Sequence, residues 1–572
     1  MPQPIAYNTG SQTSGSIKLF GIEYAVSSSI TSGSNNQRWF SSINPGNGVV
    51  FVTSNVTQSF GTYAASVPLF FTASDYTAAS ITGAINGLPD RYNQPIFTTT
   101  ASAYAFVQNS GKYFMMNYEY PQIVTRELVY EANADFLASY PRSQSLWYDI
   151  SGRGNSGSLV NSVSFTNVGA LSFDGVDDYV LIPYNPSMQP TTALTMEAWV
   201  YLNAAPPDWY SVFQSPQTNG AHTDPYFDWA IYINNNLGLH TRIDGINAPG
   251  GSPPTTTTKM QSQRWTQTVI SWEAGSAYFY LNGQLIQTTG SLPTSITYTN
   301  NTDKIIGANA GLGEDLNGYL SNVRLYNTRL SDAEVAQNYY QGPVVTDGLV
   351  FAVDPSNLIS YDTTGTLIYS LPTQSFSGSL TNGASFNRRN GGSFVFDGID
   401  DYLAYLTTPD ALEGDPNLTV CGFFRRTGNL TQDGIFGIGG EATDGGINCW
   451  NFNNTNEITI DTWNQSTFTT GVTYPLNEWV FVAWQKTAGV MTRANCTIWR
   501  NLTSYTGAQL TILRAEGPAP NINNYGVTLG SISRTTAYCA AMDVGNFFVY
   551  NRVLTPAEIA QNFNAYKSKF GL

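Results

Sequence analysis

The sequence predicts a mainly β protein in which two tandem antiparallel β-sandwiches follow a smaller N-terminal module. Three observations support this prediction. Charged residues make up only 11% of the 572 residues, while aromatic residues reach 13% beside 52 Gly and 28 Pro, a composition typical of strands separated by turns. Segments of alternating apolar and polar residues recur along the chain, as half-buried strands require. One long pattern of motifs also occurs twice.

The repeat is anchored at three places. The motif Phe-Asp-Gly-Val-Asp-Asp-Tyr at 173–179 returns as Phe-Asp-Gly-Ile-Asp-Asp-Tyr at 396–402, an offset of 223 residues. Leu-Val-Tyr at 128–130 is matched by Leu-Val-Phe at 349–351, and Ala-Glu-Val-Ala-Gln-Asn at 333–338 by Ala-Glu-Ile-Ala-Gln-Asn at 557–562. Because the offset is nearly constant, we predict two copies of one domain, at 126–343 and 344–572.

Each copy follows the same order of elements. Strands are expected at 194–202 and 265–272 in the first copy and at 418–424 and 479–484 in the second. Asn282-Gly283 predicts a hairpin, since both turn positions favour positive φ. A short helix with a capping box is expected to close each copy, with caps Ser331 and Thr555. Many strands and one terminal helix favour a two-sheet sandwich.

Residues 1–125 belong to a different module, expected to be β-rich or α+β, with its one helix at 74–88. It begins with a stretch rich in Gly, Ser, Thr and Pro at 1–16, which we expect to be an extended arm that becomes ordered along a partner.

Several classes of function are disfavoured by composition. The formal net charge is −15 and no Lys/Arg cluster offsets it, so nucleic-acid binding is not expected. No stretch is long and apolar enough for a membrane-spanning helix, and the N-terminus lacks the basic and apolar regions of a signal peptide. The four cysteines all lie in the last third, and we expect buried free thiols rather than a disulfide framework.

The linked motifs resemble the concanavalin A-like, laminin-G-type jelly-roll family over about 440 residues. The lead-in at 139–159 is similar to the version of this domain found in tailed-phage (cyanophage-like) structural proteins, and residues 1–125 look like the module that precedes it there. The second copy departs from the pattern at 371–376 and lacks the Asn-Gly hairpin at 500–502. The resemblance implies tandem jelly rolls, with the first copy closer to the family pattern.

Catalytic residues are not predicted. The only two histidines, His222 and His240, both lie in the first copy, and no Gly-x-Ser-x-Gly motif is present. Glycoside hydrolysis needs two convergent carboxylates, whereas the central strands carry Glu197 alone, with Glu273 at a strand end. We therefore expect a protein that is not an enzyme.

Two kinds of binding site are candidates. Asp174, Asp177 and Asp178, and in the second copy Asp397, Asp400 and Asp401, place three carboxylates within five residues. Such oxygen-rich clusters suit calcium, which laminin-G-type relatives often bind, but Asp and Gly also build tight turns. No cofactor is otherwise required.

A glycan site would use exposed aromatic rings beside Asp or Asn. Trp209, Tyr210, Tyr226 and Asp228 are the candidates, since they lie in stretches that read as loops. The alternative is that the aromatic residues fill the sandwich core.

Three functions remain open at this point. The first is a structural component of a tailed-phage virion (a tail, neck or head fibre) made in the host cytoplasm. It would dock on other virion proteins through residues 1–125 and could contact host surface glycans or form a homo-oligomer. The second is a bacterial carbohydrate-binding protein exported by an unseen route. The third is a polysaccharide-degrading enzyme.

Overall fold

The computed structural model describes residues 123–572, apart from short gaps at 136–138, 141–144, 167–168, 249–255, 312, 388–391, 430–432, 441, 451–454, 464 and 571. Before residue 123 it describes only five strands. The predicted helix at 74–88 and residues 1–13 of the expected arm lie outside the described residues. The end of that arm differs from the prediction, because Ser14–Ser16 pair with Ala25–Ser27 of a neighbouring strand in the same module. The five strands are β1 (Ser14–Leu19), β2 (Ile22–Ser27), β3 (Thr31–Ser32), β4 (Arg38–Phe40) and β5 (Phe51–Val52).

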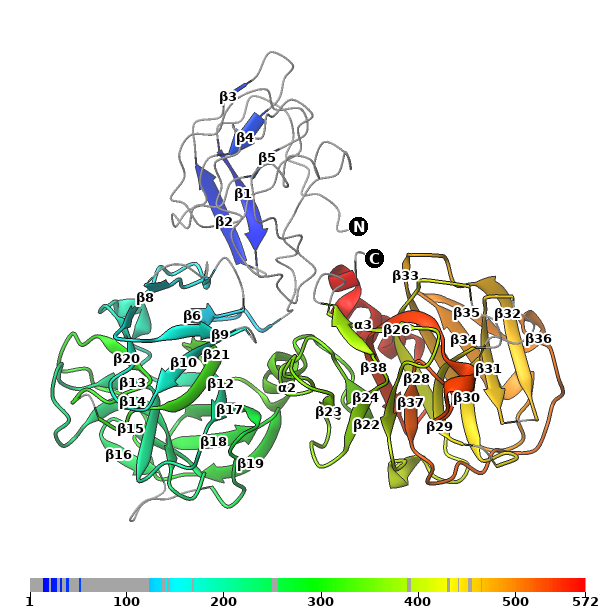
Figure 1. Cartoon of the computed structure of the whole chain (residues 1–572). Helices are drawn as coiled ribbons and strands as arrows, with labels where there is room; N and C mark the ends of the chain where they lie inside the picture. The colour runs from blue at the N-terminus through cyan, green and yellow to red at the C-terminus, as the bar shows by residue number, and fades with distance from the viewer. Residues whose placement is uncertain are drawn as a thin grey trace. The chain divides into compact units, whose positions relative to one another are not determined.

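The described part beyond residue 123 is mainly β and forms four antiparallel sheets, two in each of two compact units that divide at Gly342 and Pro343. Figure 1 shows the first unit in cyan to green and the second in green to red. The mainly β fold class is confirmed. We call the two units the first and second sandwich.

The first sandwich contains two eight-stranded sheets, each with neighbouring strands antiparallel. One sheet has the order β19 (Gln284–Thr289), β18 (Ser276–Leu281), β17 (Trp265–Glu273), β12 (Ala193–Leu202), β21 (Asn317–Tyr326), β10 (Ala170–Asp174) and β9 (Ser164–Thr166), with β6 (Leu128–Asn133) also on β21. The other has the order β16 (Ile246–Ala248), β15 (Leu239–Ile243), β14 (Phe227–Asn234), β13 (Trp209–Pro216), β20 (Lys304–Ile306), β11 (Tyr179–Ile182), β8 (Gly157–Val160) and β7 (Leu146–Trp147).

The second sandwich repeats this layout with sheets of eight and nine strands. One sheet has the order β25 (Ser385–Asn387), β26 (Ser393–Asp397), β38 (Ala541–Tyr550), β28 (Leu418–Arg426), β33 (Trp479–Lys486), β34 (Cys496–Arg500) and β35 (Thr503–Thr506), with β22 (Leu349–Val353) on β38. The other has the order β23 (Leu367–Tyr369), β24 (Ser377–Thr381), β27 (Tyr402–Tyr405), β37 (Val527–Leu529), β29 (Gly434–Gly439), β30 (Gly446–Trp450), β31 (Glu457–Thr462), β32 (Thr467–Thr473) and β36 (Thr511–Ile512).

Strand alternation builds one core per sandwich. In β12, Met196, Ala198 and Val200 point into the first core, while the residues between them point to the opposite face of the sheet. The second core is assembled in the same way, with Val420 and Phe424 of β28 among its members. All four cysteines are buried and free.

A short helix closes each sandwich, as the sequence predicts. α2 (Asp332–Tyr340) and α3 (Pro556–Tyr566) both begin with a complete capping box, formed by Ser331 with Glu334 and by Thr555 with Glu558. The predicted hairpin joins β18 to β19, with positive φ at Asn282 and Gly283. Neither helix is long and apolar enough to cross a bilayer.

One asparagine in each closing helix ties the start of the sandwich to its end. Asn338 Oδ1 accepts a hydrogen bond from the backbone N–H of Val124 at 2.8 Å. In the second sandwich Asn562 Oδ1 accepts from Val345 N–H at 2.9 Å. The chain therefore enters and leaves each sandwich at the same place.

Candidate functional site

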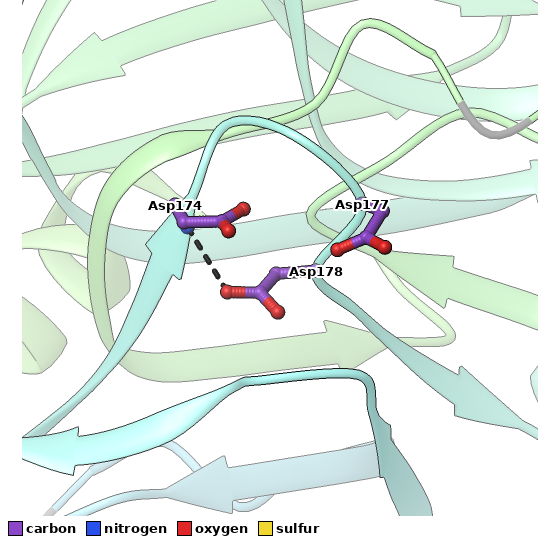
Figure 2. A group of neighbouring side chains, drawn as sticks. All are labelled: Asp174, Asp177 and Asp178. Atoms are coloured by element: carbon purple, nitrogen blue, oxygen red, sulfur yellow. Dashed lines mark hydrogen bonds between the residues drawn. The ribbon is translucent and has the colours of Figure 1, made fainter.

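The predicted acidic clusters are tight turns between β10 and β11 and between β26 and β27. In the first, Asp178 Oδ1 accepts the backbone N–H of Ser162 at 2.7 Å and Oδ2 accepts that of Asp174 at 3.0 Å. Asp174 Oδ1 in turn accepts Val176 N–H. Figure 2 shows the three carboxylates around this turn, with the bond from Asp174 to Asp178 dashed. Both oxygens of the central carboxylate are thus already hydrogen-bonded to the backbone.

The turn of the second sandwich repeats the arrangement. Asp401 Oδ2 accepts from Asp397 N–H, and Asp397 Oδ1 accepts from Ile399 N–H and Asp400 N–H. Burial is the largest influence on Asp401 and raises the pKa of its carboxyl. These bonds account for the Asp-rich motif as a means of fixing the turn.

The three carboxylates of each turn would supply only part of a calcium site. In each sandwich the three side chains place one ligand oxygen apiece within 4.8 Å of one another, but calcium takes about six to eight oxygens. Each oxygen of Asp178 also accepts one backbone N–H. Calcium binding at Asp174, Asp177 and Asp178, and at Asp397, Asp400 and Asp401, therefore stays a prediction, in which water would have to supply most of the coordination.

The four predicted glycan-binding residues occupy different environments, and two expectations about them were wrong. Tyr210 is only 5% exposed and belongs to the core of the first sandwich, because it alternates with Trp209 along β13 rather than lying in a loop. Asp228 is buried as well and accepts a hydrogen bond from Ser215 Oγ at 2.7 Å. Trp209 and Tyr226 remain partly exposed.

Trp209 and Tyr226 lie at opposite ends of a continuous row of rings, which we call the outer aromatic patch. It covers the face of β13–β15 that points away from the core. The Trp209 ring is 5.3 Å from His240 and 6.0 Å from Tyr232 between centroids. The remaining members link Tyr232 to Tyr226 through Phe227 and His222, with Arg242 above the Tyr226 ring at 4.4 Å.

Charged groups surround the Tyr226 end of the patch. His222 Nε2 lies 3.7 Å from Glu314 Oε1, and Arg242 Nη1 lies 3.9 Å from Asp224, whose side chain is 82% exposed. Burial, followed by the nearby Arg242, lowers the pKa of His222. Burial also raises the pKa of Glu314. The site therefore combines aromatic faces with a cation, with the largely buried Glu314 and with Asp224, which faces solvent.

Arg242, His240 and Glu314 were not predicted as site residues from the sequence. Alternation along Leu239–Ile243 places His240 and Arg242 on one face of β15, and this signal was available. Their contact with Tyr226 and Glu314 could not be predicted in this way, because it depends on the pairing of β14 with β15 and on two loops.

The second sandwich does not repeat this chemistry. The ladders from β13 to β15 and from β29 to β31 place Asp461 where Arg242 stands. Thr459, two residues earlier on β31, stands where His240 does. Within the described residues, a basic side chain at this position is thus particular to the first sandwich.

Glu197, the carboxylate of the central strand, is fully buried beneath α2. It accepts Arg324 Nη1 at 2.9 Å, and Arg324 Nε donates to Glu131 at 3.0 Å. Three further donors complete its shell: Trp199 Nε1, Gln267 Nε2 and Asn338 Nδ2. A carboxylate held in this way is inaccessible to a polysaccharide.

Comparison with known proteins identifies a family for part of the chain. Residues 174–336 match the family described as the concanavalin A-like lectin/glucanases superfamily. No curated protein matches the chain.

Among solved structures, Trypanosoma rangeli sialidase is 17% identical, with 37% of this chain and 33% of that one covered and a TM-score of 0.29. This chain thus spans about a third of the sialidase. Domain 4 of AbnA, an arabinanase from Geobacillus stearothermophilus in complex with arabinotriose, is 15% identical, with 37% and 97% covered and a TM-score of 0.29. The receptor binding domain of botulinum neurotoxin D is 10% identical, with 76% and 98% covered and a TM-score of 0.32.

Similarities at this level carry no argument about what the chain binds. The match at 174–336 spans β11 to β21 of the first sandwich and so includes strands of both its sheets. This part of the first sandwich is therefore similar to the laminin G-like domain of the concanavalin A-like lectin/glucanases superfamily.

Proposed function

We propose that the protein is a non-enzymatic structural component of a tailed-phage virion whose first sandwich binds host surface glycans. The outer aromatic patch is the observation that supports the glycan-binding part. Partly exposed Trp and Tyr rings can stack on the apolar face of a sugar, and neighbouring charged groups can hydrogen-bond its hydroxyls. Trp209, Tyr226, Arg242 and Asp224 would provide these two kinds of contact.

The patch also supports an assignment of the glycan to one sandwich. Asp461 replaces Arg242 in the second sandwich, which removes the cation from that position. We therefore infer one glycan site per chain, so that strong attachment would require several chains acting together.

A glycan-binding assay with two matched variants tests this proposal. Tyr226 lies under Arg242, and in the second sandwich Tyr525 lies under Arg534 at 4.0 Å in the same kind of stack. Against a panel of bacterial surface polysaccharides, Tyr226→Ala should weaken binding at least about tenfold, equivalent to roughly 1.4 kcal/mol. Tyr525→Ala should leave it unchanged. Equal losses in both variants, or none, would refute the assignment.

We also propose that the protein is not an enzyme, because of how its carboxylates are placed. Glu197 is buried in an ion cluster, so Glu314 is the carboxyl of the patch with a raised pKa and the one to test as a general acid. We expect no cleavage of the same panel. Cleavage by the wild type that disappears in Glu314→Gln would show that the protein is an enzyme.

The virion assignment depends on the resemblance of the lead-in and of residues 1–125 to tailed-phage proteins. Mass spectrometry of purified particles should detect the chain at a fixed copy number. Deletion of residues 1–13, which leaves β1 intact, should abolish incorporation and leave the melting of both sandwiches unchanged. A chain found in the culture medium without particles would instead support an exported bacterial carbohydrate-binding protein.

A further inference from the structure

A lysine, an asparagine and an aspartate meet in the interior of the second sandwich, at the C-terminal end of the chain. Lys569 belongs to the 3-10 turn η9 (Lys567–Phe570), Asn546 lies in the middle of β38, and Asp354 follows β22. Lys569 is 2% exposed, and the other two residues are fully buried.

The Lys569 ammonium uses each of its three donors on this cluster. Nζ lies 2.8 Å from Asp354 Oδ1, 2.8 Å from Asn546 Oδ1 and 2.6 Å from Ser356 Oγ. Asn546 Nδ2 has no hydrogen-bond partner among the described residues. One nitrogen nucleophile thus contacts both a carboxamide and a carboxylate, and the NH2 group of that carboxamide is not held by any described neighbour.

The surroundings of the cluster are aromatic. Phe570 packs against Phe423 at 4.6 Å and Trp479 at 4.4 Å between centroids, and Lys569 Nζ lies 5.1 Å from the Phe570 ring. Burial of the three side chains excludes water, which otherwise competes with an amine for a carbonyl carbon. Holding the groups in contact also removes the entropic cost of bringing them together.

The first sandwich provides a natural comparison. Asn322 of β21 and Asn133 of β6 pair with one another. They stand where Asn546 and Asp354 do, at offsets of 224 and 221 residues. The carboxylate is therefore replaced by an amide, and no extension like Lys567–Phe570 follows α2 before the second sandwich begins. The lysine and the aspartate occur together only in the second sandwich.

We propose that Lys569 and Asn546 become joined by an intramolecular isopeptide bond, with Asp354 as the acid–base group. Asp354 takes a proton from the Lys569 ammonium, and the free amine attacks the Asn546 side-chain carbonyl carbon. The new C–N bond forms as the Cγ–Nδ2 bond breaks. Asp354 passes a proton to Nδ2 and receives one from Nζ, so that ammonia leaves and no oxidant or other co-reactant is consumed.

Intact-mass measurement of the denatured full-length chain tests the proposal. The wild type should be lighter than its sequence mass by one ammonia. Trypsin should release residues 535–552 joined through Asn546 to residues 568–572, because a modified Lys569 is not cleaved. The free tripeptide 570–572 should be missing from the digest.

Variants locate the bond. Asn546→Ala and Asp354→Asn should both restore the full mass, while the matched change Asn322→Ala in the first sandwich should keep the deficit. A wild-type chain of full mass that yields the free 570–572 tripeptide would overturn the proposal, and this result does not depend on the folding of any variant. A mass deficit that persists in Asn546→Ala would place the lost ammonia elsewhere and would also overturn it.

Discussion

The buried ion cluster beneath α2 allows a direct test of what such clusters contribute to stability, because the equivalent positions of the second sandwich carry uncharged residues. Glu131, Arg324 and Glu197 lie side by side on β6, β21 and β12. The equivalent ladder on β22, β38 and β28 carries Ala352, Phe548 and Cys421. An ion cluster in one copy is thus replaced by apolar residues and a thiol in the other.

Two variants of the ion cluster are compared. Arg324→Met removes the shared cation and leaves two buried carboxylates without it, which we expect to cost about 3–5 kcal/mol. Burial already raises the pKa of Glu131 although Arg324 opposes it, so losing the cation should push at least one carboxyl towards its protonated form. For a sandwich of this size the melting temperature should fall by roughly 6–20 °C.

The second variant replaces the residues of the ion cluster by their uncharged counterparts from the second sandwich. Two of the three further donors to Glu197, Trp199 and Gln267, also have apolar counterparts on the ladder, since Phe423 pairs with Phe481 where Trp199 pairs with Gln267. The five changes are Glu131→Ala, Glu197→Cys, Trp199→Phe, Gln267→Phe and Arg324→Phe. Replacing a buried ion cluster in this way is expected to be neutral or stabilising by about 1–4 kcal/mol.

Differential scanning calorimetry on the full chain measures both variants, with the transition of the second sandwich as an internal reference. The reasoning is refuted if Arg324→Met melts like the wild type. It is equally refuted if the five-residue variant loses as much stability as the single change, because packing rather than unpaired charge would then explain both.

Three further predictions concern pH, capping and calcium. Burial raises the pKa of Asp228 to about 6, above an unfolded value of about 4, so the folded state holds the extra proton between these values. The free energy of unfolding measured in urea should therefore fall by at most roughly 3 kcal/mol as the pH rises from about 4 to about 6, and Asp228→Asn should abolish this fall. Ser331→Ala and Thr555→Ala should each cost about 1 kcal/mol, measured as a lower melting temperature of the first and second sandwich respectively, and a shift in the other sandwich would contradict the capping geometry. Because backbone N–H groups already fix the turn and three carboxylates supply only part of the about six to eight oxygens that calcium takes, removing calcium with EGTA should leave both melting transitions in place, and a clear drop would show that the turn does bind the ion.

Much of the fold could be predicted because the relevant signals are local. Period-2 alternation, the Asn282-Gly283 turn and the two capping boxes each depend on residues within a few positions of one another. The sequence repeat then predicted the same layout twice without any knowledge of strand pairing.

The candidate site could be predicted only in part, because its members come together through pairing across the sheet. Arg242 meets Tyr226 only once β14 and β15 are in register, and Glu314 approaches from a loop more than 70 residues later. Tyr210 was misplaced for a related reason, since the composition of 206–210 resembles a loop while Trp209–Pro216 forms a strand. The contacts of Lys569 with Asp354 and with Asn546 likewise span 215 and 23 residues, too many for any local pattern to show them.

The bonds from Asn338 to Val124 and from Asn562 to Val345 have a consequence for how such a chain can grow. A domain whose first and last segments meet can be copied in tandem, or placed within a surface loop of another protein, without any change to its interior. Equivalent anchors of the two copies lie 221–224 residues apart, and a segment of this length then acts as a cassette joined to the next one at the asparagine. Additional cassettes should be tolerated between Gly342 and Pro343. A chain with a third sandwich inserted there would keep both existing asparagine bonds.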